Sequence, residues 1–261
     1  MTFADQYGPW SIIAGASEGT GSAFARKVAA KGVNCILIAR REGPLAALAG
    51  QIRAESNVEC VTASIDLSAP DACDRIVATA GSREVGLFIS NAGSDPNGSH
   101  FLDRKIETWI ELANINQLTT MRCCHHFGGL MKARRRGALL LVGSQACYGG
   151  GKFLATYSGS KAFALCFAES LWAELKPANV DVLYFALAQT DTPALRKLVA
   201  GKGLPPPRRM ASPEAVAEVG LAHLGRGPVY NWGQLVGLRA AWRRTRIRIV
   251  DVLTRQVFGE G

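Results

Sequence analysis

The chain has 261 residues, of which 48% are hydrophobic and 20% are charged, so it is long enough to bury the core of one large α/β domain. Its mean hydropathy is +0.08, and no apolar run reaches the roughly 20 residues that a membrane-spanning helix needs. The formal net charge of +9 gathers in arginine clusters without any nucleic-acid-binding motif, so we expect no nucleic-acid partner. Residues 1–10 lack the basic start and apolar stretch of a signal peptide, which predicts a cytoplasmic protein.

The cysteines and histidines of the chain show no metal-site pattern. Seven cysteines include no Cys-x-x-Cys pair and no zinc-ligand spacing with histidine. We therefore expect reduced thiols packed in the core and no metal ligand set. His125, His126 and His223 are predicted to be packing or surface residues.

Short apolar runs alternate with longer helical patterns, which is typical of βαβ units and a parallel sheet. The longest predicted helices cover 106–133 and 157–176, and Pro177 should end the second because it cannot continue the hydrogen-bond ladder. The pattern predicts a single α/β domain over 1–261, with a doubly wound parallel sheet and helices on both faces. The predicted strands are 10–14, 35–39, 58–64, 85–90, 138–144, 180–186 and, more weakly, 228–232.

A glycine-rich turn follows the first predicted strand and leads into a helix that begins near Gly19. Glycines let such a turn bend tightly and approach a pyrophosphate, and the amides of the helix N-terminus face the anion. Because the turn comes directly after the first strand of a βαβ pattern, it predicts a dinucleotide site. The residues expected to form it are Gly15, Ser17, Gly19 and Gly21.

Arg40 and Arg41 directly follow the second predicted strand, at the place where dinucleotide-binding units can carry an acidic residue. A carboxylate there would bind the adenosine ribose and repel a 2′-phosphate, whereas arginine pairs with phosphate through two hydrogen bonds. Two arginines at a helix start would otherwise meet the helix dipole unfavourably. Together with Ser17, the two arginines favour NADP(H) over NAD(H).

Tyr157 and Lys161 stand four residues apart, on one face of a predicted helix. A free phenol has a pKa of about 10, and a nearby cation lowers it, so Tyr157 could donate a proton to an alkoxide or remove one from an alcohol. Ser144 closes the strand 138–144, and a glycine-rich turn leads from it to Tyr157.

The glycine motif, the strand-terminal serine and the Tyr-x-x-x-Lys pair, in this order, resemble the short-chain dehydrogenase/reductase family over nearly the whole chain. The resemblance implies a Rossmann-type fold, a nicotinamide cofactor, interconversion of a secondary alcohol and a ketone, and a homodimer or homotetramer. It implies that Ser144 binds the substrate oxygen, that Lys161 also holds the nicotinamide ribose, and that Asn116 supports a water that relays the proton. The further cofactor contacts that it implies, besides Tyr157 and Lys161, are Asp66, Asn91, Thr190 and Thr192.

Three positions depart from the family pattern. Ala14 replaces a threonine, Ser90 replaces an asparagine, and Leu187-Ala188 replaces a Pro-Gly pair beside the nicotinamide. Because the last change removes a rigid proline and a permissive glycine, the alternative to an enzyme is a noncatalytic NADP(H)-binding or scaffold protein.

Residues 7–24 are similar to the opening of bacterial hydroxysteroid dehydrogenases, including the 7β-acting ones. The segment 187–210, broken by prolines and glycines, predicts a substrate lid. A bulky hydrophobic alcohol or ketone is expected, with a hydroxysteroid as the leading candidate, although the lid leucines could instead pack against the domain. His100 could border the substrate. The apolar residues expected at the pocket are Phe153, Leu154, Leu187, Leu195, Leu198 and Leu204.

The C-terminal segment 234–261 mixes apolar residues with arginines. It predicts an interface with a neighbouring subunit or a cover over the pocket. The alternative is a basic amphipathic helix that lies on an anionic membrane surface.

Overall fold

The computed structural model of the chain describes residues 2–205 and 207–232. Its seven strands are β1 (Trp10–Ala14), β2 (Asn34–Ala39), β3 (Cys60–Ser64), β4 (Val85–Ser90), β5 (Gly137–Ser144), β6 (Val180–Leu187) and β7 (Val229–Asn231). They form one parallel sheet in the order β3-β2-β1-β4-β5-β6-β7. The predicted doubly wound sheet is therefore confirmed, and every predicted strand end lies within two residues of the observed one.

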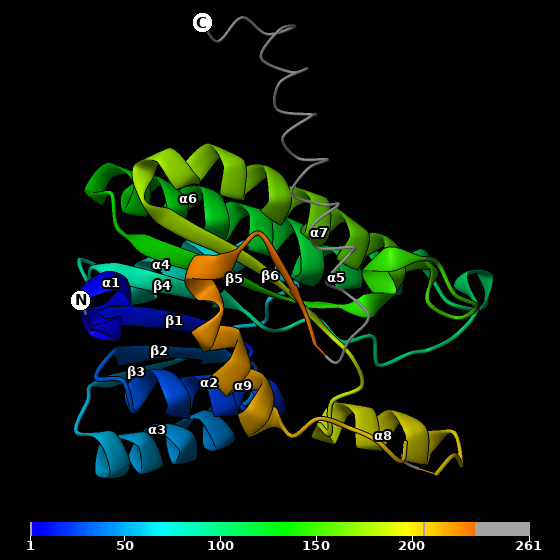
Figure 1. The fold of residues 1–261 in the computed structure, drawn as a ribbon. Helices are drawn as coiled ribbons and strands as arrows, with labels where there is room; N and C mark the ends of the chain where they lie inside the picture. Colours follow the sequence, from blue (N-terminus) through cyan, green and yellow to red (C-terminus); the bar gives the residue numbers. More distant parts are fainter. Residues whose placement is uncertain (1, 206, 233–261) are drawn as a thin grey trace, which may run out of the picture.

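Helices cover both faces of this sheet (Figure 1). One face carries α2 (Gly19–Ala29), α3 (Glu42–Ser56) and α9 (Pro213–Ala222), and the other carries α4 (Ala72–Ala80), α5 (Ile106–Ala113), α6 (Thr120–Arg134) and α7 (Ala155–Leu175). Two further helices are α1 (Phe3–Tyr7) and α8 (Pro193–Gly201). No helix in the part of the chain that the structure describes is long and apolar enough to cross a membrane.

Each face of the sheet has its own apolar core. Phe24 and Ile52 are fully buried under the helices of one face, and Phe88 and Phe127 stack under those of the other, with ring centroids 5.8 Å apart. Strands such as β1 and β4 are buried at every position because both of their faces are covered. This double coverage explains why the strands are continuous apolar runs in the sequence.

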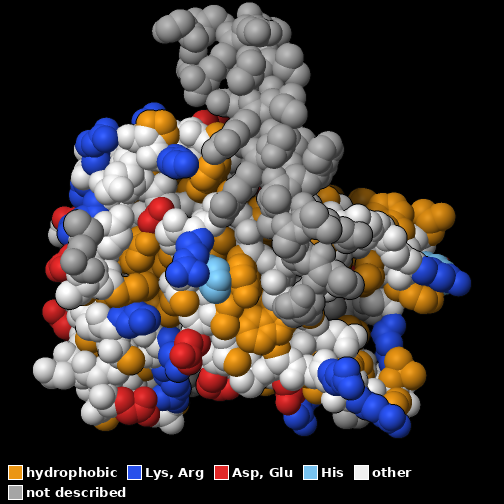
Figure 2. Space-filling view, in the orientation of Figure 1, with side chains coloured by type: hydrophobic (Ala, Val, Ile, Leu, Met, Phe, Trp, Pro, Cys, Tyr) orange, Lys and Arg blue, Asp and Glu red, His pale blue; other side chains and the backbone are white. Residues whose placement is uncertain are grey.

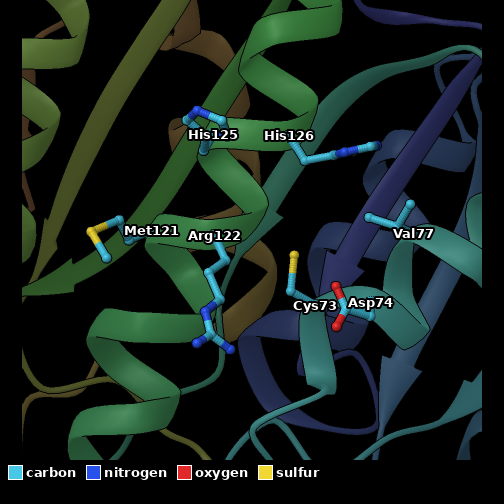
Figure 3. A pocket seen from close by; sticks show the side chains of 7 residues that line it. All are labelled: Cys73, Asp74, Val77, Met121, Arg122, His125 and His126. Atoms are coloured by element: carbon cyan, nitrogen blue, oxygen red, sulfur yellow. The ribbon is translucent and has the colours of Figure 1, made fainter.

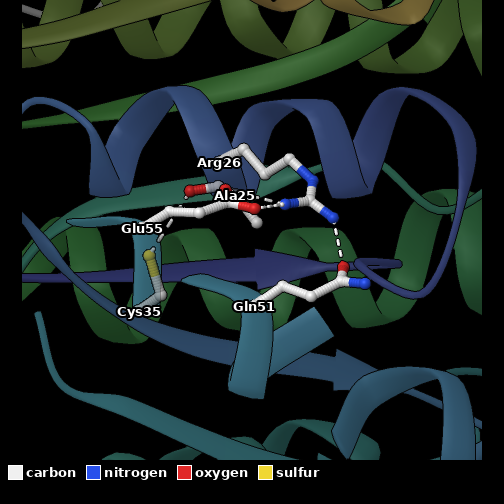
Figure 4. A network of polar contacts seen from close by, with 5 residues as sticks. All are labelled: Ala25, Arg26, Cys35, Gln51 and Glu55. Atoms are coloured by element: carbon white, nitrogen blue, oxygen red, sulfur yellow. Dashed lines mark hydrogen bonds and ion pairs between the residues drawn. The ribbon is translucent and has the colours of Figure 1, made fainter. Parts of the chain in front are cut away.

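Helix α2 is tied to α3 at the surface as well as through the core. Arg26 contacts the Glu55 carboxylate at 2.9 Å and also donates to Gln51 (Figure 4). Beneath them Cys35 on β2 donates to the Ala25 carbonyl over 3.7 Å. Exposed ion pairs contribute only about 0 to 1 kcal/mol, so apolar burial of α2 dominates this contact. All seven cysteines are free thiols, and six of them are buried.

The predicted helix 106–133 is interrupted in the structure. A π-helical turn, η2 (Asn114–Thr119), separates α5 from α6 and contains Asn116. Such turns carry one extra residue per turn and frequently occur at functional sites. The apolar periodicity of the two flanking helices gave no sign of this insertion, which explains why the sequence predicted one helix.

The predicted irregular segment 187–210 contains the helix α8. Pro193 occupies the first helical position, where its missing N–H is not needed, and the Thr192 hydroxyl accepts a hydrogen bond from the Leu195 amide at 3.2 Å. The prolines and glycines of this segment thus limit α8 to nine residues, with Pro193 at its start and Gly201 at its end. The predicted interface segment 234–261 lies outside the described residues.

Candidate functional site

The carboxyl ends of the parallel strands meet at one edge of the sheet. β1 and β4 are neighbours, and the strand order runs outward from them in opposite directions. The crevice outside such a switch point is where open α/β sheets bind ligands. Ser144 is the last residue of β5, and the turns that follow β1, β4 and β6 carry Gly15, Ser17, Asn91, Thr190 and Thr192.

The turn after β1 packs so closely against the turn after β4 that side chains would not fit between them. A Cβ atom on Gly21 would lie 1.9 Å from the Gly15 carbonyl oxygen, and one on Gly15, whose φ is +89°, would lie 2.8 Å from the Ala92 nitrogen. Asn91 braces this turn: its Nδ2 donates to the Gly15 carbonyl at 2.9 Å, and its Oδ1 accepts from the Thr20 hydroxyl at 2.8 Å. The side-chain amide of Asn91, which was predicted to contact the cofactor, thus holds the glycine loop in shape.

The first turn of α2 has the features of a phosphate site. Glu18 precedes the helix, but its carboxylate makes no capping hydrogen bond with the helix amides. Ser17 is half-buried in the same loop. Gly19, with a φ of +57°, lies so close to Thr192 that a Cβ would stand 3.2 Å from the threonine Cγ2. The uncapped amides of the first turn of α2 and the tightly packed backbone at Gly19 fit the pyrophosphate of a dinucleotide.

The two arginines after β2 each lie beside a carboxylate. Arg41 is the residue before α3, and its Nη2 lies 2.5 Å from Glu18 Oε2 at an exposed position. Burial raises the pKa of Asp66, but hydrogen bonds from Ser68 and the positive charge of Arg40 outweigh it and lower this pKa. A 2′-phosphate would therefore compete with Glu18 for Arg41.

Ser144, Tyr157 and Lys161 come together between the end of β5 and the start of α7. The Ser144 hydroxyl oxygen accepts from the Ala146 amide at 3.1 Å, and the hydroxyl also forms a hydrogen bond with Tyr157. The Lys161 ammonium lies 5.6 Å from the centre of the Tyr157 ring and donates to the Val142 carbonyl at 3.3 Å. Tyr157 and Lys161 follow Ser144 by 13 and 17 residues in the sequence, and the fold brings the three side chains together.

Burial governs the titration of these groups. It raises the pKa of Tyr157, and the hydrogen bond from Ser144 opposes this rise. It lowers the pKa of Lys161 to about 8. The expectation that Lys161 lowers the pKa of Tyr157 was wrong, because removal of the phenol from water raises this pKa. Tyr157 therefore remains a phenol near neutral pH.

Asn116 is buried in the π-helical turn. Its Nδ2 donates to the Leu112 carbonyl at 3.0 Å, and its Oδ1 has no hydrogen-bond partner among the described residues. Gly93, with a φ of +131°, packs against it so closely that a Cβ would stand 2.2 Å from that oxygen. A buried acceptor without a partner is costly, and a water or a ligand donor relieves that cost.

The residues after β6 lie next to the glycine loop through the Gly19–Thr192 contact. Thr190 is buried, and its hydroxyl donates to the Ala188 carbonyl at 3.2 Å, within the unusual Leu187-Ala188 turn. Ser90, another departure from the family pattern, shares a 2.8 Å hydrogen bond with the Thr120 hydroxyl. At both positions where the chain departs from the family pattern, a residue thus forms a hydrogen bond within the protein.

The end of α8 contacts the turn that precedes Tyr157. Lys202 donates to the Gly98 carbonyl, and its ammonium lies 5.5 Å from the centre of the Phe153 ring. His100 contacts the same ring, with centroids 4.5 Å apart. Basic and hydrophobic side chains lie side by side at this end of the molecule (Figure 2). Phe153 and Leu204 are 41% and 56% exposed.

A separate cavity of about 460 Å³ lies between α4 and α6 (Figure 3). None of the predicted site residues lines it. His125 is exposed there and His126 is half-buried. Its lining residues are Cys73, Asp74, Val77, Met121, Arg122, His125 and His126.

The doubly wound sheet, the glycine loop at its switch point and the Ser, Tyr and Lys side chains beside that loop define an oxidoreductase that acts on CH–OH groups. The chain belongs to the short-chain dehydrogenase/reductase family. A family model described as short chain dehydrogenase matches residues 10–203. The predicted family and enzyme class are confirmed.

Curated relatives include enzymes with different substrates. The 7beta-hydroxysteroid dehydrogenase of Collinsella aerofaciens is 33% identical over 201 residues, which cover 77% of this chain and 76% of that protein. The very-long-chain 3-oxoacyl-CoA reductase of Podospora anserina is 33% identical over 218 residues, which cover 82% of this chain and 64% of that protein.

Solved structures give the same picture of the fold. One from a study of 7beta-hydroxysteroid dehydrogenase stereoselectivity has a TM-score of 0.83 and 30% identity, and covers 90% of this chain and 91% of that one. A short-chain dehydrogenase from Sphingobium yanoikuyae in complex with NADPH has a TM-score of 0.80 over 97% of this chain and 96% of that one. At 23% identity, the second structure shows a shared fold alone.

Proposed function

We propose that the protein is an NADP(H)-dependent oxidoreductase that interconverts a secondary alcohol and a ketone on a bulky hydrophobic substrate, with a hydroxysteroid as the leading candidate. The observation that carries this proposal is the meeting of Ser144, Tyr157 and Lys161 at the same edge of the sheet as a glycine loop that fits a pyrophosphate. The 7beta-hydroxysteroid dehydrogenases among the relatives support the substrate class.

In this proposal the nicotinamide, when bound, supplies or accepts the hydride, and the protein handles the proton. Tyr157 donates its phenolic proton to the oxygen of the ketone, and takes a proton from the alcohol in the opposite direction. The Ser144 oxygen accepts from the Ala146 amide, and its hydroxyl hydrogen would turn from the Tyr157 oxygen to the same substrate oxygen when the ketone binds. The two donors stabilise the negative charge that develops there.

Lys161 and Asn116 support this proton transfer. The Lys161 ammonium would stabilise the phenolate as the proton leaves Tyr157, and would hold the hydroxyls of the nicotinamide ribose. The unpartnered Oδ1 of Asn116 would accept a hydrogen bond from a water that returns a proton to the site. These roles agree with the burial of both side chains.

The cofactor end of the site supports NADP(H) over NAD(H). Arg40 and Arg41 follow β2, and Arg41 already binds a carboxylate, Glu18, where a 2′-phosphate would bind. Replacing Arg40 with Asp should shift the preference toward NADH, with about 1.5 to 3 kcal/mol of phosphate binding lost. A wild-type protein that prefers NADH in direct competition would contradict this assignment.

The segment 187–210 is proposed to be a lid over the substrate. None of the six apolar residues predicted at the pocket is fully buried, so they retain accessible apolar surface. Lys202 links the end of α8 to the Gly98 carbonyl and the Phe153 ring, next to the turn before Tyr157. Large apolar surfaces with few polar groups suit rigid hydrophobic ligands.

An assay on purified protein tests the function. Hydroxysteroids, long-chain alcohols, aromatic ketones and small sugars are compared in both cofactor directions. We expect turnover of the bulky apolar compounds and its loss in Tyr157→Phe, whereas Tyr7→Phe, far from the site, should remain active. Tight NADPH binding without turnover, with Tyr157→Phe behaving as wild type, would support the noncatalytic scaffold instead.

The protein is also proposed to form a homodimer or homotetramer. Ile106 and Ile110 on α5 and Phe163 on α7 are large apolar side chains that are 54%, 51% and 37% exposed, and these two helices pack together. Exposed apolar patches of this kind mark interaction surfaces. Light scattering coupled to gel filtration should give a mass of two or four chains, and a monomer at micromolar concentration would contradict the proposal.

A further inference from the structure

Tyr184 is a fully buried tyrosine on β6, the strand next to β5. No sequence motif includes it. The core would accept a phenylalanine at this position, but a hydroxyl group in an apolar interior needs hydrogen-bond partners. The hydrogen-bond partners of the Tyr184 hydroxyl are main-chain groups of two proposed catalytic residues, Ser144 and Lys161.

The Tyr184 hydroxyl bridges the two elements that carry the proposed catalytic groups. It accepts a hydrogen bond from the Ser144 amide at 3.1 Å, and it lies 3.2 Å from both the Ser144 and the Lys161 carbonyl oxygens. Its one hydrogen is therefore shared between these two carbonyls. Burial raises the pKa of Tyr184 above its ordinary value, so the hydroxyl keeps this hydrogen.

The chain makes room for this ring at a specific position. Gly143 lies on β5 directly before Ser144, and a Cβ atom there would stand 2.0 Å from Cζ of Tyr184 and 2.3 Å from its hydroxyl oxygen. The absence of a side chain on Gly143 thus allows the Tyr184 hydroxyl to reach the main chain at Ser144. The pair of glycine and tyrosine on neighbouring strands forms one structural unit.

We infer that Tyr184 is a positioning residue, whose hydroxyl holds the end of β5 and the second turn of α7 at the separation that brings Ser144 and Lys161 to Tyr157. The inference rests on the proposed function. Near-attack geometry is sensitive to shifts of about 1 Å, which can cost about 100-fold in rate. Without the hydroxyl, the main chain at Ser144 and the main chain at Lys161 lose the link through Tyr184, and only the side-chain contacts between β5 and α7 remain.

The test compares Tyr184→Phe with Tyr7→Phe. Tyr7 is another buried tyrosine, and its hydroxyl donates to the Asp181 carboxylate at 2.7 Å, at the opposite end of β6. Both variants lose one buried hydroxyl, so both should lose thermal stability. Only Tyr184→Phe should lower kcat, by about 10- to 100-fold, with KM for the ketone within about threefold of wild type.

Two further readouts separate positioning from a general loss of structure. The pH profile of kcat should shift in Tyr184→Phe and stay in place in Tyr7→Phe, because only the former changes the surroundings of Tyr157 and Lys161. The effects of Ser144→Ala and Tyr184→Phe should not add in the double variant, because both act through Ser144. All assays are run well below the melting temperature of the least stable variant.

The outcomes distinguish this inference from the proposed function. A kcat of Tyr184→Phe within twofold of wild type, in a protein whose turnover depends on Tyr157, would overturn the inference alone. A wild-type protein that turns over no carbonyl compound, and in which Tyr157→Phe changes nothing, would overturn the proposed function and the inference with it.

Discussion

Lys161 is a charged side chain in an apolar interior, and replacing it with Met should make the protein more stable while abolishing turnover. Its side chain is nearly buried, and its ammonium donates to the Val142 carbonyl at 3.3 Å. No ion pair within residues 2–205 and 207–232 includes it. A buried charge without an opposite charge destabilises the folded state, and methionine fills a similar volume without that charge.

The magnitude follows from the pKa. Burial lowers the pKa of Lys161 from 10.5 to about 8, and a shift of this size disfavours the charged form by about 3 kcal/mol in the folded state. Loss of the hydrogen bond to Val142 costs about 1 to 2 kcal/mol. The Lys161→Met variant should therefore be about 1 to 2 kcal/mol more stable at pH 7, which is about 2 to 8 °C in Tm for a domain of this size.

The pH dependence of the free energy of unfolding gives the sign of the Lys161 effect independently. The unfolded chain keeps the Lys161 proton up to pH 10.5, whereas the folded chain releases it near pH 8. Between these values the unfolded state binds more protons, so this lysine makes wild-type stability rise with pH. The advantage of the Met variant should therefore be largest below pH 8 and should shrink toward pH 10.5.

Urea unfolding of wild type and Lys161→Met at pH 7 and pH 9.5 measures this difference. Groups other than Lys161 titrate equally in both proteins and cancel in the comparison. Lys132→Met, at an exposed position on α6, is the matched control and should change neither the stability nor its pH dependence. A Met variant that is less stable than wild type at pH 7, or a difference that stays constant between the two pH values, would refute the reasoning.

Three further predictions follow from the site. Gly93→Ala should lower kcat more than about tenfold, because its Cβ would stand 2.2 Å from the Asn116 Oδ1; a kcat near that of wild type would show that this contact is unimportant. Glu18→Gln should release Arg41 and tighten NADPH binding by about two- to fivefold in a fluorescence titration, with NADH binding unchanged. The kcat for ketone reduction should fall as pH rises through about 8, where Lys161 loses its proton, and a flat profile up to pH 9 would contradict the role of the ammonium.

Much of the fold and the motif residues could be predicted from the sequence, because their signals are local. A strand that is covered on both faces, such as β1 or β4, must be apolar at every position, so it stands out as a short apolar run. A tight turn before a helix requires glycine, which marked the loop that begins at Gly15. A tyrosine and a lysine one helical turn apart necessarily share a helix face, which marked Tyr157 and Lys161.

Only the tertiary structure decided how these groups behave. The pKa values of Tyr157 and Lys161 depend on how much water the surrounding elements remove, and no motif encodes that quantity. The Asn91 amide turns to the Gly15 carbonyl because the loops after β1 and β4 meet there, a contact that no sequence motif indicated.

The sequence by itself therefore determined the strands, the glycine loop and the identity of the Tyr and Lys pair, because each depends on neighbouring residues in the chain. Tyr184 gave no such signal: its partners lie 40 and 23 residues away, and the space for its ring is left by Gly143 on another strand. Hydrogen bonds between distant residues form only where the packed sheet brings them within reach, so the positions of Ser144 and Lys161 relative to each other are a property of the folded molecule.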